Sequence, residues 1–322
     1  MFSVAPQPVL AATSPVASGG HTGAVPQLRT AKVAKAADAP PLQRSQPLLL
    51  ASSDELLRKF AARDVRLEDV RTGRAEVPAI FLARFPADLA KLTSVKQRKQ
   101  VFIKTVLPLI LRTNQQIAAD RRLLLRLLRS DSDGQGLSEL EQNLLSRLGQ
   151  RYGVDPQDRA ELLQRIDIVP ASLALAQGAE ESGWGTSRFA RLGNAVFGQR
   201  AFKGAGMVPQ ERAPGARFVV RAFNALEKSV RAYVWNLNTH PAYGAFRTAR
   251  AAMRDAGQPL DSHALAGALT RYSERGDAYV DTIRSIIRGN GLQQFDDARL
   301  TYRDKTAANA HDVRNISGRD GS

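Results

Sequence analysis

Apolar side chains recur at helical spacing over most of the chain from residue 52 onward. Ser52 and Glu55 form a capping-box pattern ahead of the first such run, so ordered structure is expected to begin there. A longer run covers roughly residues 94–129 and contains Pro108. Because proline lacks a backbone N–H, we expect the helix to kink or break at Pro108. The apolar stretch around it is shorter than the about 20 residues that span a bilayer, which predicts a buried helix.

Further helices are predicted from their capping residues. Their starts are expected at Ser138 with Glu141, Asp155–Pro156, Asn224 with Glu227, Asp261 or Ser262, and Asp277. Trp235 lies in one of these helices beside Val234 and Leu237, and it is expected in the core. Strands are predicted only within Gln199–Phe223, where residues 218–223 follow Pro214–Gly215 and suggest a β-hairpin. The pattern predicts a mainly α, α+β fold: a helical bundle with a small β-hairpin lobe.

A short apolar helix that ends in two carboxylates, Glu180 and Glu181, carries the candidate chemistry. Pro170 suits its first turn, and Gly183 and Gly185 stop it. Adjacent residues on a helix point about 100° apart, so the two carboxylates cannot enter one site.

We place Glu181 at that site because it follows Gln177 by one turn and lies beside Trp184. Both the helix C-terminus and burial against Trp184 disfavour a carboxylate, which raises its pKa above about 4.3. A raised pKa suits a proton donor to a leaving oxygen. On spacing alone, these residues could equally end a surface helix. Glu274 and Arg275 could form a structural pair.

Several separated motifs resemble one enzyme family. The run AQGAEESGWG at residues 176–185 and NAVFG at 194–198 are similar to the glucosaminidase domains of glycoside hydrolase family 73, which act on peptidoglycan. The segments at 236–247 and 272–279 resemble more narrowly the bacterial Bax-type group, and those at 77–86 and 102–114 resemble its helical N-terminal region. The resemblance implies a lysozyme-like fold and hydrolysis of the β-1,4 bond after N-acetylglucosamine.

The resemblance also implies roles for individual residues. The catalytic acid falls on Glu181 and the active-site tyrosine on Tyr243, while Glu211 on the β lobe is the candidate to act on water. The residues expected to bind substrate are Gly183, Trp184, Asn194, Phe197 and Gly198. A tyrosine after His240-Pro241 could instead cover a helix junction.

Three mechanisms remain open at this point. Two carboxylates roughly 5–5.5 Å apart suit retention, roughly 6.5–9.5 Å suit inversion, and the substrate's own N-acetyl oxygen could serve as nucleophile. A lytic transglycosylase, which uses one glutamate, is the rival enzyme class. A wall-binding or nucleic-acid-binding protein without turnover is the rival outside the enzymes.

The amino-acid composition of the chain narrows the classes of molecule that it is expected to bind. The chain has 322 residues, of which 46 are basic and 31 acidic, giving a net charge of +15 that favours polyanionic surroundings such as peptidoglycan with its peptide carboxylates. Nucleic acid is not expected, because the arginines follow amphipathic helices with few aromatic residues nearby. Four scattered histidines and no cysteine give no metal-site spacing. We expect no cofactor and a monomer.

The predicted organisation has four parts. Residues 1–50 are a disordered leader or tether, 51–150 a helical N-terminal region, 151–300 the glucosaminidase domain, and 301–322 a polar tail. No convincing secretory signal is found, because the apolar stretch at residues 9–12 is short and follows two prolines. A periplasmic or envelope location therefore rests on the resemblance.

Overall fold

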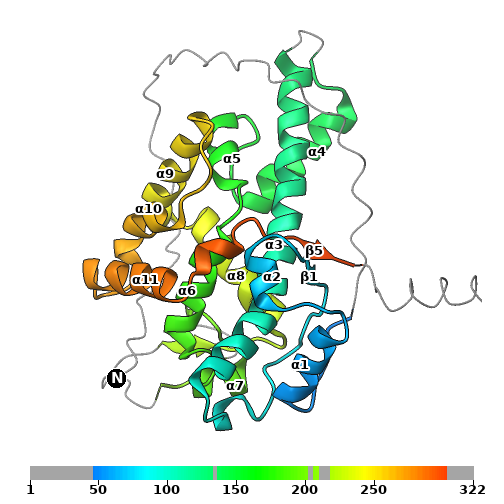
Figure 1. Cartoon of the computed structure of the whole chain (residues 1–322). Helices are drawn as coiled ribbons and strands as arrows, with labels where there is room; N and C mark the ends of the chain where they lie inside the picture. The colour runs from blue at the N-terminus through cyan, green and yellow to red at the C-terminus, as the bar shows by residue number, and fades with distance from the viewer. Residues whose placement is uncertain (1–45, 133–135, 202–205, 210–217, 303–322) are drawn as a thin grey trace, which may run out of the picture. The chain divides into compact units, whose positions relative to one another are not determined.

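The computed structural model describes residues 46–132, 136–201, 206–209 and 218–302. Glu211 and Pro214–Gly215 lie outside the described residues, as do the leader and most of the polar tail. The helices of the described part are α1 (Ser53–Ala61), α2 (Leu67–Arg71), α3 (Val95–Ser132), α4 (Glu139–Tyr152), α5 (Arg159–Arg165), α6 (Ala171–Ser182), α7 (Arg188–Gly193), α8 (Leu226–Thr239), α9 (Gly244–Asp255), α10 (Ser262–Ala266) and α11 (Asp277–Gly289). Short 3₁₀ turns are η1 (Leu89–Lys91), η2 (Pro241–Tyr243), η3 (Gly267–Tyr272) and η4 (Leu292–Phe295). The predicted helical architecture is confirmed (Figure 1).

Capping residues set three of the predicted helix starts. Ser138 and Glu141 make a complete capping box at α4, and the Ser52 hydroxyl accepts a hydrogen bond from the Glu55 backbone at α1. Asp261 caps α10 as predicted. The predicted start at Asn224 is wrong by one residue, because Ala225 takes the cap position of α8 without a side-chain hydrogen bond.

Helix α5 also starts later than predicted. Asp158, rather than Asp155–Pro156, is its cap, and its side chain accepts a hydrogen bond from the Glu161 backbone.

A kink or a break is expected at Pro108, and the structure excludes the break, because helix α3 continues through this residue. The helix on either side of Pro108 is surrounded by other elements: Val106, Leu107 and Leu109 have no exposed surface. A proline removes one backbone hydrogen bond, and this apolar burial outweighs that loss. The C-terminal half of α3 packs against α4 as a helical hairpin (Figure 1).

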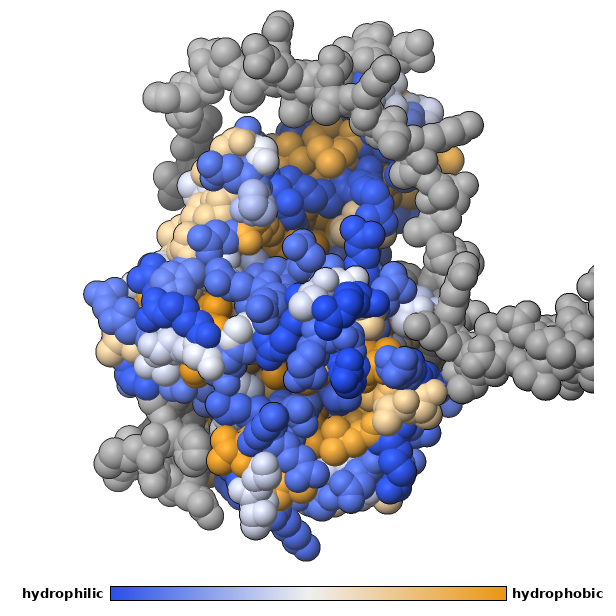
Figure 2. Space-filling view, in the orientation of Figure 1, coloured by the Kyte–Doolittle hydropathy of each residue, from blue (hydrophilic) through white to orange (hydrophobic). Residues whose placement is uncertain are grey.

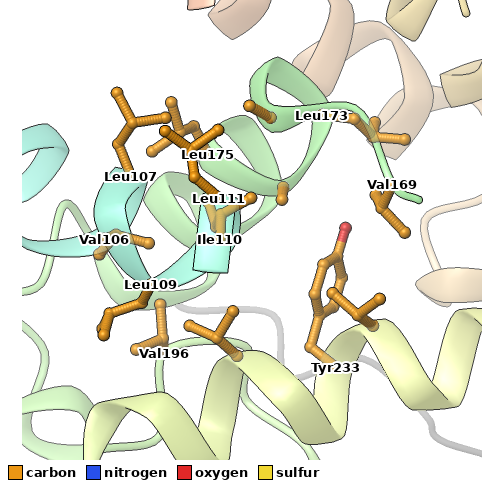
Figure 3. Close-up of a cluster of buried hydrophobic side chains, with 14 of the residues drawn as sticks. Val106, Leu107, Leu109, Ile110, Leu111, Val169, Leu173, Leu175, Val196 and Tyr233 are labelled. Carbon is orange, nitrogen blue, oxygen red and sulfur yellow. The ribbon is translucent and has the colours of Figure 1, made fainter. Parts of the chain in front are cut away.

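The core lies where α3, α6 and α8 meet. Figure 3 shows apolar side chains of these three helices in one cluster, with the Tyr233 side chain extending from α8 toward α6. Both the predicted N-terminal region and the predicted glucosaminidase domain contribute to this cluster, since α3 packs against α6 and α8. The core therefore fixes α6, the helix of the candidate acid, from two sides.

A small antiparallel sheet forms the β lobe. Its strands β2 (Arg200–Ala201), β4 (Val219–Arg221) and β3 (Gly206–Met207) lie in that order, and Val220 pairs with both outer strands. The predicted strand within residues 218–223 is confirmed. The lobe follows α7 directly and so lies beside the end of α6.

A second, parallel sheet was not predicted. It joins β1 (Val77–Pro78) to β5 (Leu300–Thr301), with two residues in each strand. Strands this short carry no alternating pattern, so only the fold brings them together.

Trp235 is not in the core, and that prediction is wrong. Its side chain is 48% exposed, and its indole N–H donates to the Arg151 carbonyl oxygen at 3.3 Å. Tyr233, Val234 and Leu237 form the buried face of α8, and the position after Val234 is rotated about 100° away from that face. The apolar neighbours in sequence are therefore not neighbours of the indole ring.

Candidate active site

The candidate acid, Glu181, lies near the end of helix α6, most of which is buried. Every residue from Ala171 to Ala179 is buried, which suits the run of small and apolar side chains there. Gly183 ends the helix in the left-handed conformation, with φ 56°, and its N–H bonds to the Ala179 carbonyl oxygen. Trp184 follows with φ 58°, a conformation that is uncommon for a bulky residue. The chain thus reverses sharply immediately after Glu181.

The two glutamates point in different directions, as predicted from helical geometry. Glu180 forms an ion pair with Arg275, whose Nη2 lies 2.7 Å from its Oε1. Glu181 faces Gly198 of the loop that enters the β lobe: a Cβ added to Gly198 would lie 3.2 Å from Glu181 Oε2. Gly198 also has φ +58°, so glycine meets both the space and the backbone requirement at this position.

A buried hydrogen-bond chain ends beside the Glu181 carboxyl. The Tyr233 hydroxyl donates to the Gln177 side-chain oxygen at 2.7 Å, and the Gln177 side-chain nitrogen donates to the Tyr279 hydroxyl at 2.9 Å. The Tyr279 hydroxyl in turn lies near the Glu181 carboxyl and lowers its pKa. Gln177 precedes Glu181 by one turn, so both lie on the face of α6 that meets Tyr279.

The pKa of Glu181 is raised to about 8, mainly because the protein around the carboxyl displaces water. The negative charge of Glu180 adds to this rise. The Tyr279 hydroxyl and the positive charges of Arg275 and Arg200 oppose it. The shift has the predicted direction.

Four tyrosines pack together beside Glu181; we refer to Tyr233, Tyr243, Tyr272 and Tyr279 as the tyrosine cluster. Tyr272 stacks on Tyr279 with ring centroids 5.4 Å apart, and it lies 5.9 Å from Tyr243 and 6.5 Å from Tyr233. All four side chains are buried. The fold therefore brings the predicted Tyr243 into the cluster beside Glu181, but the tyrosine that lowers the pKa of Glu181 is Tyr279.

The segment after α7 supports this arrangement. Asn194 ends α7 in the left-handed conformation, and its side-chain nitrogen donates to the Phe223 carbonyl oxygen at 2.9 Å. Phe197 is buried and stacks on Tyr233 at 3.9 Å. Of the residues predicted to bind substrate in this segment, Gly198 faces the acid, whereas Asn194 and Phe197 hold the segment in place.

Trp184 faces helix α3. Its ring packs edge-on against Phe102 at 5.5 Å, and Lys99 Nζ lies 4.8 Å above it. Trp184 is partly exposed, which leaves part of the ring accessible.

The suggested pairing of Glu274 with Arg275 is wrong. Glu274 is 3.5 Å from Arg200 of the β lobe, while Arg275 pairs with Glu180 and lies over the Tyr279 ring at 5.3 Å. Glu274 and Arg275 are adjacent in the sequence but pair with different elements, Glu274 with the β lobe and Arg275 with helix α6. Three of these four charged groups, Glu180, Arg275 and Arg200, influence the pKa of Glu181.

Tyr279 and Tyr233 are the residues near Glu181 that the sequence did not identify. The sequence contains only part of the information that would identify them. Gln177 lies one turn before Glu181, and Tyr279 ends the motif at 272–279. Their contact depends on the packing of α6 against α11 and on the hydrogen bond from Tyr233 of α8 to Gln177 of α6.

Within the described ranges, no group of three or more His, Cys, Asp and Glu side chains is arranged to hold a metal ion. The helices described here also include none that is long and apolar enough to cross a membrane.

Comparison with known proteins identifies relatives of this chain. Residues 157–292 match the family model described as glucosaminidase, mannosyl-glycoprotein endo-beta-N-acetylglucosaminidase. The chain is 37% identical over 209 residues to the protein bax of Escherichia coli (strain K12), a match that covers 63% of this chain and 73% of the relative. Among solved structures, the catalytic domain of the autolysin Auto from Listeria monocytogenes matches with 15% identity and a TM-score of 0.32, covering 53% of this chain and 97% of that domain.

Proposed function

This chain belongs to the Bax-type glucosaminidase family, and we propose that it hydrolyses the β-1,4 bond after N-acetylglucosamine in peptidoglycan, with Glu181 as general acid. The protonated Glu181 would give its proton to the leaving oxygen as the glycosidic bond breaks. The observation that carries this proposal is the raised pKa of Glu181 at the end of α6, next to a tyrosine hydroxyl.

Tyr279 is proposed as the residue that positions Glu181. The Tyr279 hydroxyl accepts a hydrogen bond from Gln177, whose side-chain oxygen accepts one from Tyr233. These bonds hold the hydroxyl in place beside the carboxyl, so the carboxyl has a defined orientation. An acid held in one orientation directs its proton to one substrate atom.

Tyr243 remains our candidate for orienting the N-acetyl group or the nucleophilic water. It contacts the tyrosine cluster through Tyr272 and has no exposed surface. A contact with substrate would therefore need a movement that opens this part of the cluster. A Tyr243→Phe variant tests the role: lost turnover with unchanged folding supports it, and wild-type turnover removes Tyr243 from the mechanism.

Glu211 remains the candidate for activating water. Retention and inversion both need a second carboxylate such as Glu211, whereas substrate assistance does not. A Glu211→Gln variant separates the first two from the third. Azide rescue of that variant, with formation of a glycosyl azide, would support a carboxylate that attacks or activates water. Unchanged activity would favour the N-acetyl oxygen as nucleophile.

We propose that the protein acts in the cell envelope as a monomer, without nucleic acid. The net charge of +15 would draw it to the carboxylates of the wall polymer, an attraction that salt screens. Mass spectrometry of digested peptidoglycan tests the reaction. New reducing ends on N-acetylglucosamine support the proposal, and anhydro-muramic ends would assign the protein to the lytic transglycosylases.

A further inference from the structure

We propose that a pocket between α2, the first turns of α3 and the end of α11 binds the acidic peptide carried by the glycan. This inference rests on the proposed function, because it names the form of peptidoglycan that the enzyme prefers. The pocket encloses about 340 Å³, within the usual range for ligand sites. None of the residues that line it belongs to the tyrosine cluster.

The walls of the pocket carry more positive than negative charge. Arg71, Lys96 and Lys99 line it together with a single carboxylate, Glu68. The side-chain amides of Gln100 and Asn290 add groups that can donate or accept hydrogen bonds.

Buried apolar residues form the other part of the lining. Leu67 and Ile103 are almost completely buried, and Val95 at the edge is 58% exposed. The pocket therefore joins an apolar surface to a cationic rim, an arrangement that suits a small molecule or chain with both kinds of group.

Two of the cations are held in position. Lys99 Nζ donates to Asn290 Oδ1 at 2.7 Å, and the Arg71 guanidinium donates to the Gln294 side-chain oxygen at 3.1 Å while lying 4.3 Å over the Phe295 ring. Because these contacts fix the charges before a ligand arrives, less conformational entropy is lost on binding. Lys96 is exposed at the rim.

The pocket is connected to the candidate active site in two ways. Lys99 lies over the ring of Trp184, which follows Glu181 in the same motif. Helix α11 carries Tyr279 in its first turn and ends next to Asn290, which places the pocket roughly 16 Å along the helix from the tyrosine near Glu181. A group attached to a sugar near the cleaved bond could reach that far.

The charged side chains that line the pocket indicate which kind of ligand it binds. Three cations attract carboxylates, Glu68 attracts an amine, and the apolar surface takes small alkyl side chains. A short peptide with several carboxylates, a free amine and methyl side chains satisfies all of these groups, whereas a bare sugar chain satisfies none of the charged ones. Figure 2 shows hydrophilic residues over most of the face that carries α2 and α11, so a charged ligand can approach from solvent.

Kinetics on two substrates test this inference. Peptide-bearing glycan strands and the same strands stripped of peptide by an amidase are digested by wild type, Lys96→Glu and the control Lys91→Glu, whose lysine is exposed outside the pocket. The ratio of kcat/KM between the two substrates should favour the peptide-bearing form in wild type and Lys91→Glu. It should fall roughly fivefold in Lys96→Glu, since reversing one exposed charge changes binding by about 1 kcal/mol. An unchanged ratio in Lys96→Glu would overturn the inference.

A binding experiment separates this inference from the proposed function. In a Trp235→Phe background Trp184 is the one remaining tryptophan, and it lies next to Lys99. The free peptide released from the wall should shift its fluorescence, and Lys96→Glu should weaken that binding. Equal binding of inorganic phosphate, or no shift with the peptide, would overturn the pocket assignment even if the enzyme cleaves peptidoglycan. If the peptide binds but no glycan is cleaved, the proposed function fails and the pocket stands.

Discussion

The Tyr279 hydroxyl, on helix α11, lies near the carboxyl of Glu181 at the end of helix α6. Gln177 and Tyr233 fix the tyrosine from the other side. This contact lowers the pKa of Glu181, while the burial that raises it is the larger effect. The pKa of Glu181 is thus set mainly by desolvation, with Tyr279 as the first of the groups that oppose it.

Replacing Tyr279 with phenylalanine should raise the pKa of Glu181 further. The variant removes a hydroxyl that stabilises the carboxylate, so the proton is held to a higher pH. Because a general acid must be protonated, activity falls as pH rises through this pKa, and the fall should move upward in the variant. The pH profile of kcat/KM measures it.

Tyr152→Phe is the matched control for this experiment. It also removes a hydroxyl beside a carboxylate, that of Asp120 at 2.9 Å, but away from the site. Its profile should keep the wild-type midpoint. A downward move of the midpoint in Tyr279→Phe would show that the tyrosine does not stabilise the ionised acid.

Replacing Glu181 with glutamine should change the pH dependence of stability. The pKa of Glu181 is raised from 4.5 to about 8 on folding, so its favourable contribution is complete below pH 4.5 and is lost as pH rises through 8. Glutamine cannot ionise. The variant should therefore have a higher Tm than wild type near pH 9 and a similar Tm near pH 4, in thermal melts across this range.

Glu180→Gln gives the contrast to that variant. Glu180 is partly exposed and paired with Arg275, so its loss should bring no gain in Tm at high pH. If Glu181→Gln and Glu180→Gln behave alike across the pH range, Glu181 does not have the proposed ionisation behaviour.

Replacing Gly198 with alanine should reduce activity more than stability. Its positive φ costs roughly 1–2 kcal/mol for any other residue, and the added Cβ would press on Glu181 Oε2 at 3.2 Å. Gly257→Ala supplies the comparison, because Gly257 has φ +66° with no atom within 4 Å of the added Cβ. Chemical denaturation should show similar losses of unfolding free energy in both variants.

Activity should separate the two glycine variants. We expect kcat to fall at least tenfold in Gly198→Ala and to stay near wild type in Gly257→Ala, in a peptidoglycan digestion assay. Equal kcat values in the two variants would mean that the space in front of the Glu181 carboxyl does not matter for turnover.

The sequence predicted the features of the site that depend on one helix. The spacing from Gln177 to Glu181 and the stop at Gly183 indicated which glutamate turns inward, because both follow from helical geometry. The partners of Glu181 could not be predicted in this way. Tyr279 reaches it only because α11 packs against α6, and no local pattern reports such a contact.

The errors in the predicted fold have related causes. The local cost of proline predicts a kink or a break at Pro108, but that cost takes no account of the burial around it, and α3 continues unbroken. Trp235 was expected in the core because its neighbours in the chain are apolar, although the next position on a helix faces elsewhere. In the first case tertiary packing outweighs the local cost, and in the second the rotation of the helix decides which residues are neighbours.

Digestion of purified peptidoglycan by wild type and Glu181→Gln, at a series of pH values, tests the central claim most directly. Wild type should release fragments with N-acetylglucosamine at the reducing end, at a rate that declines as pH rises through about 8. The Glu181→Gln variant should be slower by roughly 10²–10⁴-fold while melting like a folded protein. Wild-type rates in Glu181→Gln, or a rate independent of pH into the alkaline range, would contradict a general-acid role for Glu181.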